Sequence, residues 1–273
     1  MDAVQALILG IVQGLTEWLP VSSSGHLVIL QEVWGLDVPV LFDVLLHVAT
    51  ALVVLVFLRK EVGEILKSLA RFMKRWRAGE KASVVLREED GALTAWLIVV
   101  GTVPTALMGF ALWRWINPLF HSLLVVAVGL IITGAVLSLT YAVRKRGGKP
   151  LGTAGALAVG VVQGIALIPG ISRSGATIST GLLLGAERVR VARYSFLLAV
   201  PAILGAAMAG ALDAGSGSLN VDALSLTIAL VSAAVSAFLA LRLLFAIISR
   251  ARFYAFAPYC LAAGIALLVW VVL

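Results

Sequence analysis

Long apolar stretches set the strongest limit on what this chain can fold into. A helix needs roughly 20 apolar residues to cross a hydrocarbon core of about 30 Å. Stretches of that kind lie at residues 41–58, 92–112, 119–143, 194–212, 223–248 and 253–273. Only 13% of the residues are charged, against about 25% in a soluble domain. Because lipid leaves backbone polar groups without partners outside helices and closed barrels, the six stretches predict an all-α polytopic membrane protein with six transmembrane helices.

Four further apolar segments are too short for spans and are broken by Gly, Pro or Ser. They lie at residues 3–12, 25–34, 153–168 and 176–185. At roughly 10–16 residues each, they suit re-entrant half-helices better than full crossings. We therefore expect two re-entrant helix–loop–helix hairpins, over 3–34 and 153–185, within one membrane domain that covers residues 1–273.

Basic residues cluster on one side of the predicted spans. The clusters lie at 59–90, 144–149, 188–193 and 250–252, whereas the loops 113–118 and 213–222 hold one basic residue between them. The positive-inside rule places the clusters in the cytoplasm and the N-terminal segment outside the cell (plasma or inner) membrane. Membrane topology therefore accounts for the net charge of +7. We expect membrane lipids as the partner of these basic residues, and no nucleic acid.

One motif occurs twice. Residues 13–26 read QGLTEWLPVSSSGH and residues 163–176 read QGIALIPGISRSGA, which align without a gap. Three predicted spans separate them, so the copies enter the membrane from opposite faces. This predicts an inverted-topology repeat of residues 1–150 and 151–273, in which broken helices meet near the midplane.

The first motif carries an acid, hydroxyls and an imidazole. Its polar and turn positions are Gln13, Glu17, Ser22, Ser23, Ser24, Gly25 and His26. Gln13 and Glu17 share a helix face, Pro20 ends or kinks that helix, and His26 is expected to begin the next one. Hydroxyls and free N–H groups at a helix N-terminus form an anion site.

The second motif, residues 163–177, offers the same turn with a guanidinium in it. Its polar and turn positions are Ser172, Arg173, Ser174, Gly175 and Thr177. Arginine in such a turn suits bidentate phosphate binding. A charge at the centre of a membrane helix costs roughly 2.5–3.5 kcal/mol and usually serves function. The structural alternative is that the serines only cap helices and that Glu17 and Arg173 form an ion pair. Asp43 and His47 could also face the site or pair with each other.

Both motifs resemble a known family. Residues 13–26 fit the patterns (E/Q)-x-x-x-E and P-x-S-S-(S/T)-G-H, and residues 169–177 read PGISRSGAT. These are similar to the motifs of the undecaprenyl-diphosphate phosphatase (BacA/UppP, bacitracin-resistance) family. The resemblance implies a membrane hydrolase that converts undecaprenyl (polyprenyl) diphosphate to the monophosphate carrier of cell-wall and envelope polymers. It also implies an outward-facing site, a divalent cation (Mg²⁺ or Ca²⁺) and a possible homodimer.

The resemblance assigns the family's serine, histidine, acid and arginine by position to Ser23, His26, Glu17 and Arg173. Glu17 is also the candidate metal ligand, and Gln13 stands where many members have a second Glu. The expected substrate-binding positions are Gln13, Ser22, Ser24, Gly25, Ser172, Ser174, Gly175 and Thr177. Two mechanisms stay open: Ser23 attacks with His26 or Glu17 as base, or His26 attacks or activates water while Ser23 binds phosphate.

Two other functions fit parts of the pattern. SSSGH resembles an element of type-2 phosphatidic acid phosphatases, but SRSGATIST lacks the second histidine of that family. Inverted repeats with broken helices are also transporter architecture, so a polyprenyl-phosphate flippase, alone or as a second role, is the main alternative.

Overall fold

Helices make up nearly all the regular structure. The computed structural model describes residues 1–36, 38–120, 122–146, 148–214 and 221–273. Within them, a single isolated β-bridge, Lys149 with Ala186, is the exception to helix. The helices are α1 (Ala3–Trp18), α2 (Ser23–Trp34), α3 (Val40–Phe57), α4 (Arg59–Arg77), α5 (Ala82–Glu88), α6 (Asp90–Phe120), α7 (Leu123–Val143), α8 (Thr153–Ile165), α9 (Arg173–Leu183), α10 (Arg188–Ala214), α11 (Ala223–Ser249), the 3₁₀ turn η1 (Phe253–Phe256) and α12 (Ala257–Val272).

Five of these helices are long and apolar enough to cross a membrane: α6, α7, α10, α11 and the run from Phe253 to Val272. The predicted span 41–58 corresponds to α3, which is joined to the charged helix α4 by a bend of 74° at Leu58 and adds a sixth candidate if the bent pair is one span. The prediction of an all-helical chain with several membrane spans is therefore confirmed. Residues 113–118, expected as a loop, instead continue α6 to Phe120.

The two short apolar helices α1 and α8 are each followed by a turn and another short helix, α2 or α9. Helix α1 runs past the apolar segment 3–12 to Trp18 and stops two residues before Pro20, so Gln13 and Glu17 lie on it as predicted. Helix α2 begins at Ser23 and not at His26, since the Ser22 hydroxyl accepts the Gly25 N–H at 3.3 Å and so caps the helix three residues sooner.

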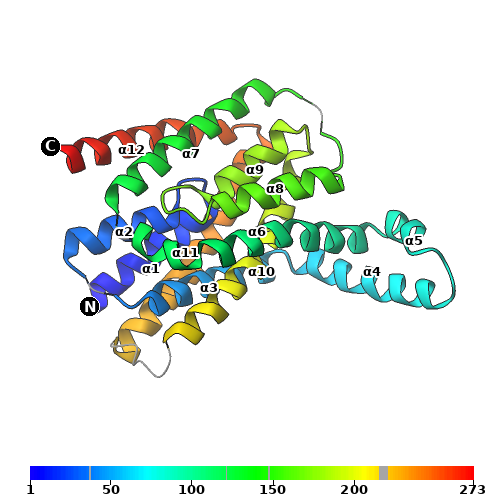
Figure 1. Ribbon diagram of the computed structural model, residues 1–273, viewed down its shortest axis with the longest axis horizontal. Helices are drawn as coiled ribbons and strands as arrows, with labels where there is room; N and C mark the ends of the chain where they lie inside the picture. Colours follow the sequence, from blue (N-terminus) through cyan, green and yellow to red (C-terminus); the bar gives the residue numbers. More distant parts are fainter. Residues whose placement is uncertain (37, 121, 147, 215–220) are drawn as a thin grey trace.

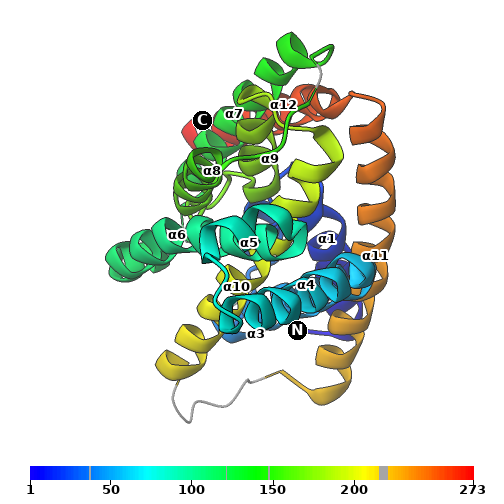
Figure 2. The ribbon, with the colours of Figure 1, turned by 90° about the vertical axis from the view of Figure 1, so that its right-hand side faces the viewer.

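Helices from the first half of the chain pack on helices from the second half. Helix α1 lies against α11, as Figure 2 shows, while α8 lies against α6; α7 packs on α12 and α3 on α10. Glycines allow the first two contacts to be close. An added Cβ at Gly10 would overlap the Ala229 carbonyl, and one at Gly160 would overlap the Gly101 backbone. These contacts fix where the C-terminal ends of α1 and α8 stop inside the bundle.

The largest buried cluster lies where α1 ends against α10. Trp18 is fully buried and meets Phe196 edge-to-face, with ring centroids 5.2 Å apart. Ile178 of α9 and Leu241 of α11 belong to the same cluster. The turn that follows Trp18 therefore starts from a rigid base.

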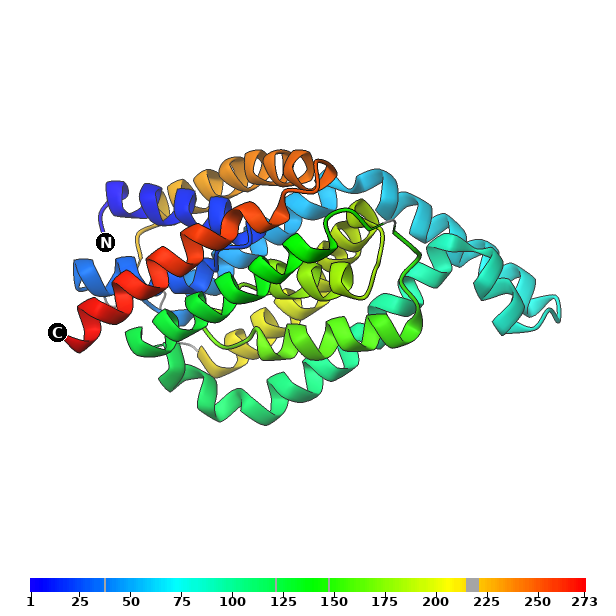
Figure 3. The same ribbon diagram turned by 90° about the horizontal axis from the view of Figure 1, so that it is seen from above.

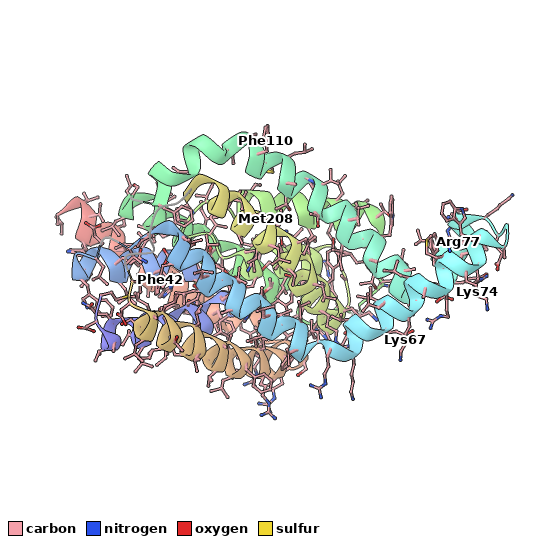
Figure 4. All side chains as sticks on the ribbon, turned by 90° about the horizontal axis from the view of Figure 1, so that it is seen from below. Phe42, Lys67, Lys74, Arg77, Phe110 and Met208 are labelled. Carbon is pink, nitrogen blue, oxygen red and sulfur yellow. The ribbon has the colours of Figure 1, made fainter. Side chains whose placement is uncertain are left out.

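Both chain termini lie at one end of the molecule, and an arm built from α4 and α5 projects from the other (Figures 1 and 3). Arg71 bonds Glu64 and Glu89 at 2.7 and 2.9 Å, and hydrogen bonds from Arg71 and Ser68 lower the pKa of Glu89. Figure 4 shows Lys67, Lys74 and Arg77 along α4, and Phe110 projecting from α6 away from the bundle. The arm thus carries ion pairs and basic side chains beside exposed apolar ones such as Leu66 and Trp76, whereas residues such as Phe110 and Met208 expose apolar side chains on the long helices.

Candidate active site

The two motifs meet inside the bundle as two matching turns. Ser22 caps α2 and Ser172 caps α9, each by accepting the N–H of a glycine three residues on, at 3.3 and 3.1 Å. In each turn the cap hydroxyl also meets the hydroxyl two residues on, at 3.4 Å to Ser24 and 3.2 Å to Ser174. Two helix N-termini, each with a rim of serine hydroxyls, therefore border the same cavity.

The matching turns differ in backbone strain. Ser22 has a φ of 69°, in the left-handed region that favours glycine, whereas Ser172 has a φ of −71°. The second turn is braced from α7 instead: the Thr133 hydroxyl donates to the Gly170 carbonyl at 3.2 Å and accepts the Ser172 N–H at 2.9 Å.

Glu17 is the centre of the site. Its side chain is 2% exposed and lies in the last turn of α1, the negative end of that helix, where a carboxylate needs donors nearby. Ser23 donates to Oε2 at 2.5 Å and Gln13 donates to the same oxygen at 3.0 Å. Arg173, from the N-terminus of α9, donates to Oε1 and forms an ion pair with it. The acid of one motif and the arginine of the other are therefore in direct contact.

A histidine from α3 completes the surroundings of Glu17. Nε2 of His47 lies 3.4 Å from Glu17 Oε2, while its Nδ1 donates to the Asp43 carbonyl at 2.7 Å. The Asp43 carboxylate accepts Gln31 Nε2 at 2.9 and 3.1 Å. Of the two alternatives that the sequence left for Asp43 and His47, the structure shows the first: both residues line the cavity, whereas the His47 ring bonds the backbone carbonyl of Asp43 and not its carboxylate.

His26 points elsewhere. Its Nδ1 donates to the Ser22 carbonyl at 2.7 Å, and its Nε2 lies 2.6 Å from the Tyr259 hydroxyl on α12. The His26 and Tyr259 rings stack with an angle of 9° between them. Both ring nitrogens are thus occupied, and His26 is absent from the described residues that line the cavity. Its catalytic role stays a prediction.

The remaining expected positions shape the second turn. Thr177 donates to the Arg173 carbonyl at 2.7 Å and lies 2.5 Å from the Ser195 hydroxyl. Ser174 donates to the Leu19 carbonyl at 3.2 Å and so ties the two motifs together. Among the described cavity-lining residues, neither appears, nor do Gln13, Gly25 and Gly175.

A cavity of about 320 Å³ opens beside Glu17. The cavity is polar around Glu17, where the two motifs and α3 meet. Elsewhere its lining comes from α2, α3, α6, α10 and the second motif and is mostly apolar, with Gln31 and Glu32 of α2 as the polar exceptions. The polar lining consists of Glu17, Ser22, Ser23, Ser24, Gln31, Glu32, Asp43, His47, Gln163, Ser172 and Arg173. The apolar lining includes Val28, Leu36, Val38, Val44, Phe120, Leu167, Ile171, Ala202, Ile203 and Ala206. The shape suits a ligand with a charged head and an apolar tail.

The donor set around Glu17 does not fit a divalent cation held by the protein. Such a cation needs several oxygen ligands, and in the described part of the chain no three His, Cys, Asp or Glu side chains are placed to hold one ion. Both Glu17 oxygens already face N–H or O–H donors, two of which, on Arg173 and His47, carry or can carry positive charge. The described residues therefore form no ready-made site at this carboxylate for the cation that the family resemblance implies, and that cation stays a prediction.

Sequence reasoning missed three lining residues. Gln31 and Glu32 are polar residues within an apolar segment, which is the signal that could have singled them out. Gln163 repeats Gln13 in the second motif and bonds Thr105 at 3.2 Å while lining the cavity. Its place in the repeat was visible, but its side-chain direction depends on the packing of α8 against α6.

Comparison with known proteins identifies relatives along almost the whole chain. Residues 6–266 match the family described as "Bacitracin resistance protein BacA". The chain is 45% identical over 270 residues to an undecaprenyl-diphosphatase of Desulfosudis oleivorans, covering 97% of each chain. It is 42% identical over 270 residues to one of Korarchaeum cryptofilum, covering 98% of this chain and 99% of the relative. It is 34% identical over 275 residues to one of Bacteroides thetaiotaomicron, with the same coverage. A family match of this length, with relatives this similar from end to end, means that the chain belongs to the bacitracin resistance protein BacA family.

Proposed function

We propose that this multi-pass membrane protein hydrolyses undecaprenyl (polyprenyl) diphosphate to the monophosphate and phosphate. The reaction recycles the lipid carrier for cell-wall and envelope polymers and confers bacitracin resistance. The observation that carries the proposal is the contact of Glu17 with Ser23 and Arg173, from two distant motifs, at the polar end of an otherwise apolar cavity. Relatives that align over nearly the full chain are named for this activity.

The diphosphate binds at the polar end. Arg173 supplies charge and paired N–H donors, which suit phosphoryl oxygens. The N-termini of α2 and α9 add backbone N–H groups and positive dipole ends. Ser22, Ser24 and Ser172 stand at the rim of the cavity and complete the donor set. Phosphoryl transfer depends mainly on such positioning and charge compensation.

Ser23 is the proposed nucleophile and Glu17 its base, since the Ser23 hydroxyl already donates to Glu17 at 2.5 Å. Ser23 Oγ forms a bond to the terminal phosphorus while its proton moves to Glu17 Oε2. The bond from that phosphorus to the bridging oxygen breaks, and its electron pair leaves with the polyprenyl monophosphate. Water then forms a bond to the phosphorus, the bond to Ser23 Oγ breaks, and the proton on Glu17 returns to the serine oxygen.

The alternative in which His26 attacks or activates water requires its ring to leave Tyr259 and Ser22. Trapping the enzyme during turnover distinguishes the two routes, because the phosphate is found on Ser23 in one and on His26, or on neither, in the other.

The isoprenoid tail occupies the apolar part of the cavity between α2, α3 and α10. This part is lined by the N-terminal half of α3 and the C-terminal half of α10. By the positive-inside rule both halves lie toward the outer face. The proposed site therefore opens to the periplasmic or extracellular side.

The same proposal includes the inverted repeat with its re-entrant hairpins at 3–34 and 153–185. Two features support it: α1 packs on α11 just as α8 packs on α6, and the two serine caps make matching hydrogen bonds. Partners beyond the lipid substrate are the membrane lipids and, by family resemblance, a second copy of the chain.

The reciprocal packing also fits a flippase, which would move the polyprenyl-phosphate carrier across the bilayer. Purified protein in detergent separates the two functions, because transport needs no hydrolysis. Release of phosphate from C15 and C55 polyprenyl diphosphates supports the phosphatase, and Arg173→Ala should abolish it. A protein that releases no phosphate but moves carrier in liposomes supports the flippase instead.

A further inference from the structure

His47 lies in the cavity but has no part in the reaction proposed above. Its side chain is 25% exposed, toward the cavity, and its Nε2 approaches Glu17 Oε2 at 3.4 Å. Ser23 and Gln13 donate to the same oxygen. His47 therefore approaches the proposed base from a third element, α3, which belongs to neither motif.

The hydrogen bonds of His47 determine what its Nε2 offers to Glu17. A backbone carbonyl can only accept, so the Nδ1 atom that faces the Asp43 carbonyl at 2.7 Å carries a proton. In a neutral ring Nε2 would then bring a lone pair toward a carboxylate oxygen. The contact between Nε2 and Glu17 Oε2 is favourable only when a proton lies between these two atoms, in addition to the proton on Nδ1. With that proton on Nε2, the imidazole faces Glu17 Oε2 as a donor at 3.4 Å.

Arg173 faces two demands at once. Without substrate its guanidinium is paired with Glu17, yet the proposed reaction needs the same group for the phosphate. When Arg173 turns to the diphosphate, Glu17 remains buried at the C-terminal end of α1 and keeps only its other donors. Gln13 and Ser23 are neutral, and Ser23 is consumed as the nucleophile.

We infer that His47 is a positioning residue that holds Glu17 in place of Arg173 and so releases Arg173 to bind the phosphate. Asp43 fixes the imidazole through its carbonyl, and Gln31 fixes Asp43. The α10 residues that line the cavity beside them, Ala202 and Ile203, bring no charge. The inference rests on the proposed function, since it assumes that Arg173 binds substrate.

The test compares variants of the full-length protein with C15 diphosphate in detergent. His47→Ala removes the donor, and His47→Gln keeps an N–H donor without the ring. Leu52→Ala, on the same helix but exposed at its outer face, is the matched control. We expect His47→Ala to raise KM about tenfold, equal to about 1.4 kcal/mol of lost binding. Turnover should change by less than about threefold, because binding of ground state and transition state is lost equally.

His47→Gln should recover at least half of the logarithmic change in KM, and Leu52→Ala should match the wild type. A KM within about twofold of wild type for His47→Ala, or equal impairment by Ala and Gln, overturns the inference. If the Ala variant does not fold, His47→Leu fills the space of the ring without a donor and takes its place. Arg173→Ala in the same assay keeps the two ideas apart: if it retains normal turnover, the proposed site itself is wrong.

Discussion

The ion pair between Glu17 and Arg173 allows stability and activity to be separated. Arg173→Ala leaves a carboxylate that is 2% exposed without its charged partner. Breaking a buried pair from one side costs about 3–5 kcal/mol. Because Arg173 is 18% exposed and His47 still faces the same carboxylate at 3.4 Å, the expected cost lies near the lower figure, about 3 kcal/mol. For a chain of this length, about 2–4 °C per kcal/mol gives a fall in Tm of about 6–12 °C.

Adding Glu17→Gln to Arg173→Ala should restore at least half of that loss in Tm. The amide oxygen of Gln still accepts the Ser23 hydroxyl, and no charge stays buried. Turnover should remain lost in both variants, because the base and the phosphate ligand are gone. Arg193→Ala is the control, since its pair with Glu61 at 3.2 Å is solvent-accessible and such pairs contribute about 0–1 kcal/mol.

Thermal unfolding of the detergent-purified variants, followed by tryptophan fluorescence, measures these shifts beside phosphate release. A Tm for Arg173→Ala within about 2 °C of wild type, equal to about 1 kcal/mol or less, contradicts the reasoning. So does a double variant that melts as low as the single one. Either result would mean that other groups compensate the charge of Glu17 completely when Arg173 is absent.

Three further outcomes are expected. Ser23→Ala should lower phosphate release at least about 100-fold, whereas Ser24→Ala should lower it less than about tenfold, because only the hydroxyl at position 23 acts together with the base. Similar losses at both positions would count against Ser23 as the nucleophile. Gly160→Val should lower Tm, since overpacking costs about 1–3 kcal/mol, while Gly152→Ala, with open space around the added Cβ, should not; an unchanged Gly160→Val protein refutes the close contact of α8 with α6. Chelator-treated protein should bind less than about one Mg²⁺ per chain by calorimetry without diphosphate, because the site lacks the several oxygen ligands such an ion needs; tight stoichiometric binding would show a metal site that the described residues do not form.

The spans were predictable from the sequence because apolar length is a local property. Each long apolar run became a helix regardless of its neighbours, and the prediction of an all-helical chain is confirmed. The meeting of Glu17 with Arg173 was also predictable from the sequence, because both charges lie in matching motifs within an apolar chain and opposite charges in an apolar region pair.

Side-chain directions were not predictable. His26 was expected to begin a helix next to Ser23, but α2 starts three residues sooner. Three residues turn a helix by almost one full turn, and the ring then meets Tyr259, a residue more than 200 positions away in the chain. His47 was visible as a polar residue in a span, but its contact with Glu17 depends on how α3 packs against α1, which no local pattern encodes.

The strained backbone at Ser22 has an evolutionary consequence. Holding a non-glycine residue in the left-handed region costs of order 1–3 kcal/mol, while the duplicate position Ser172 carries no such cost. Glycine at position 22 would relieve the strain and, at the same time, remove the hydroxyl that caps α2 and reaches Ser24. The two matching turns are therefore under different constraints in evolution: the turn at Ser22 keeps its hydroxyl at a cost in folding stability, and the turn at Ser172 does not. If the turn around Ser22 were grafted in place of the turn around Ser172, the strained φ would fall where Thr133 of α7 already binds the backbone in an unstrained conformation.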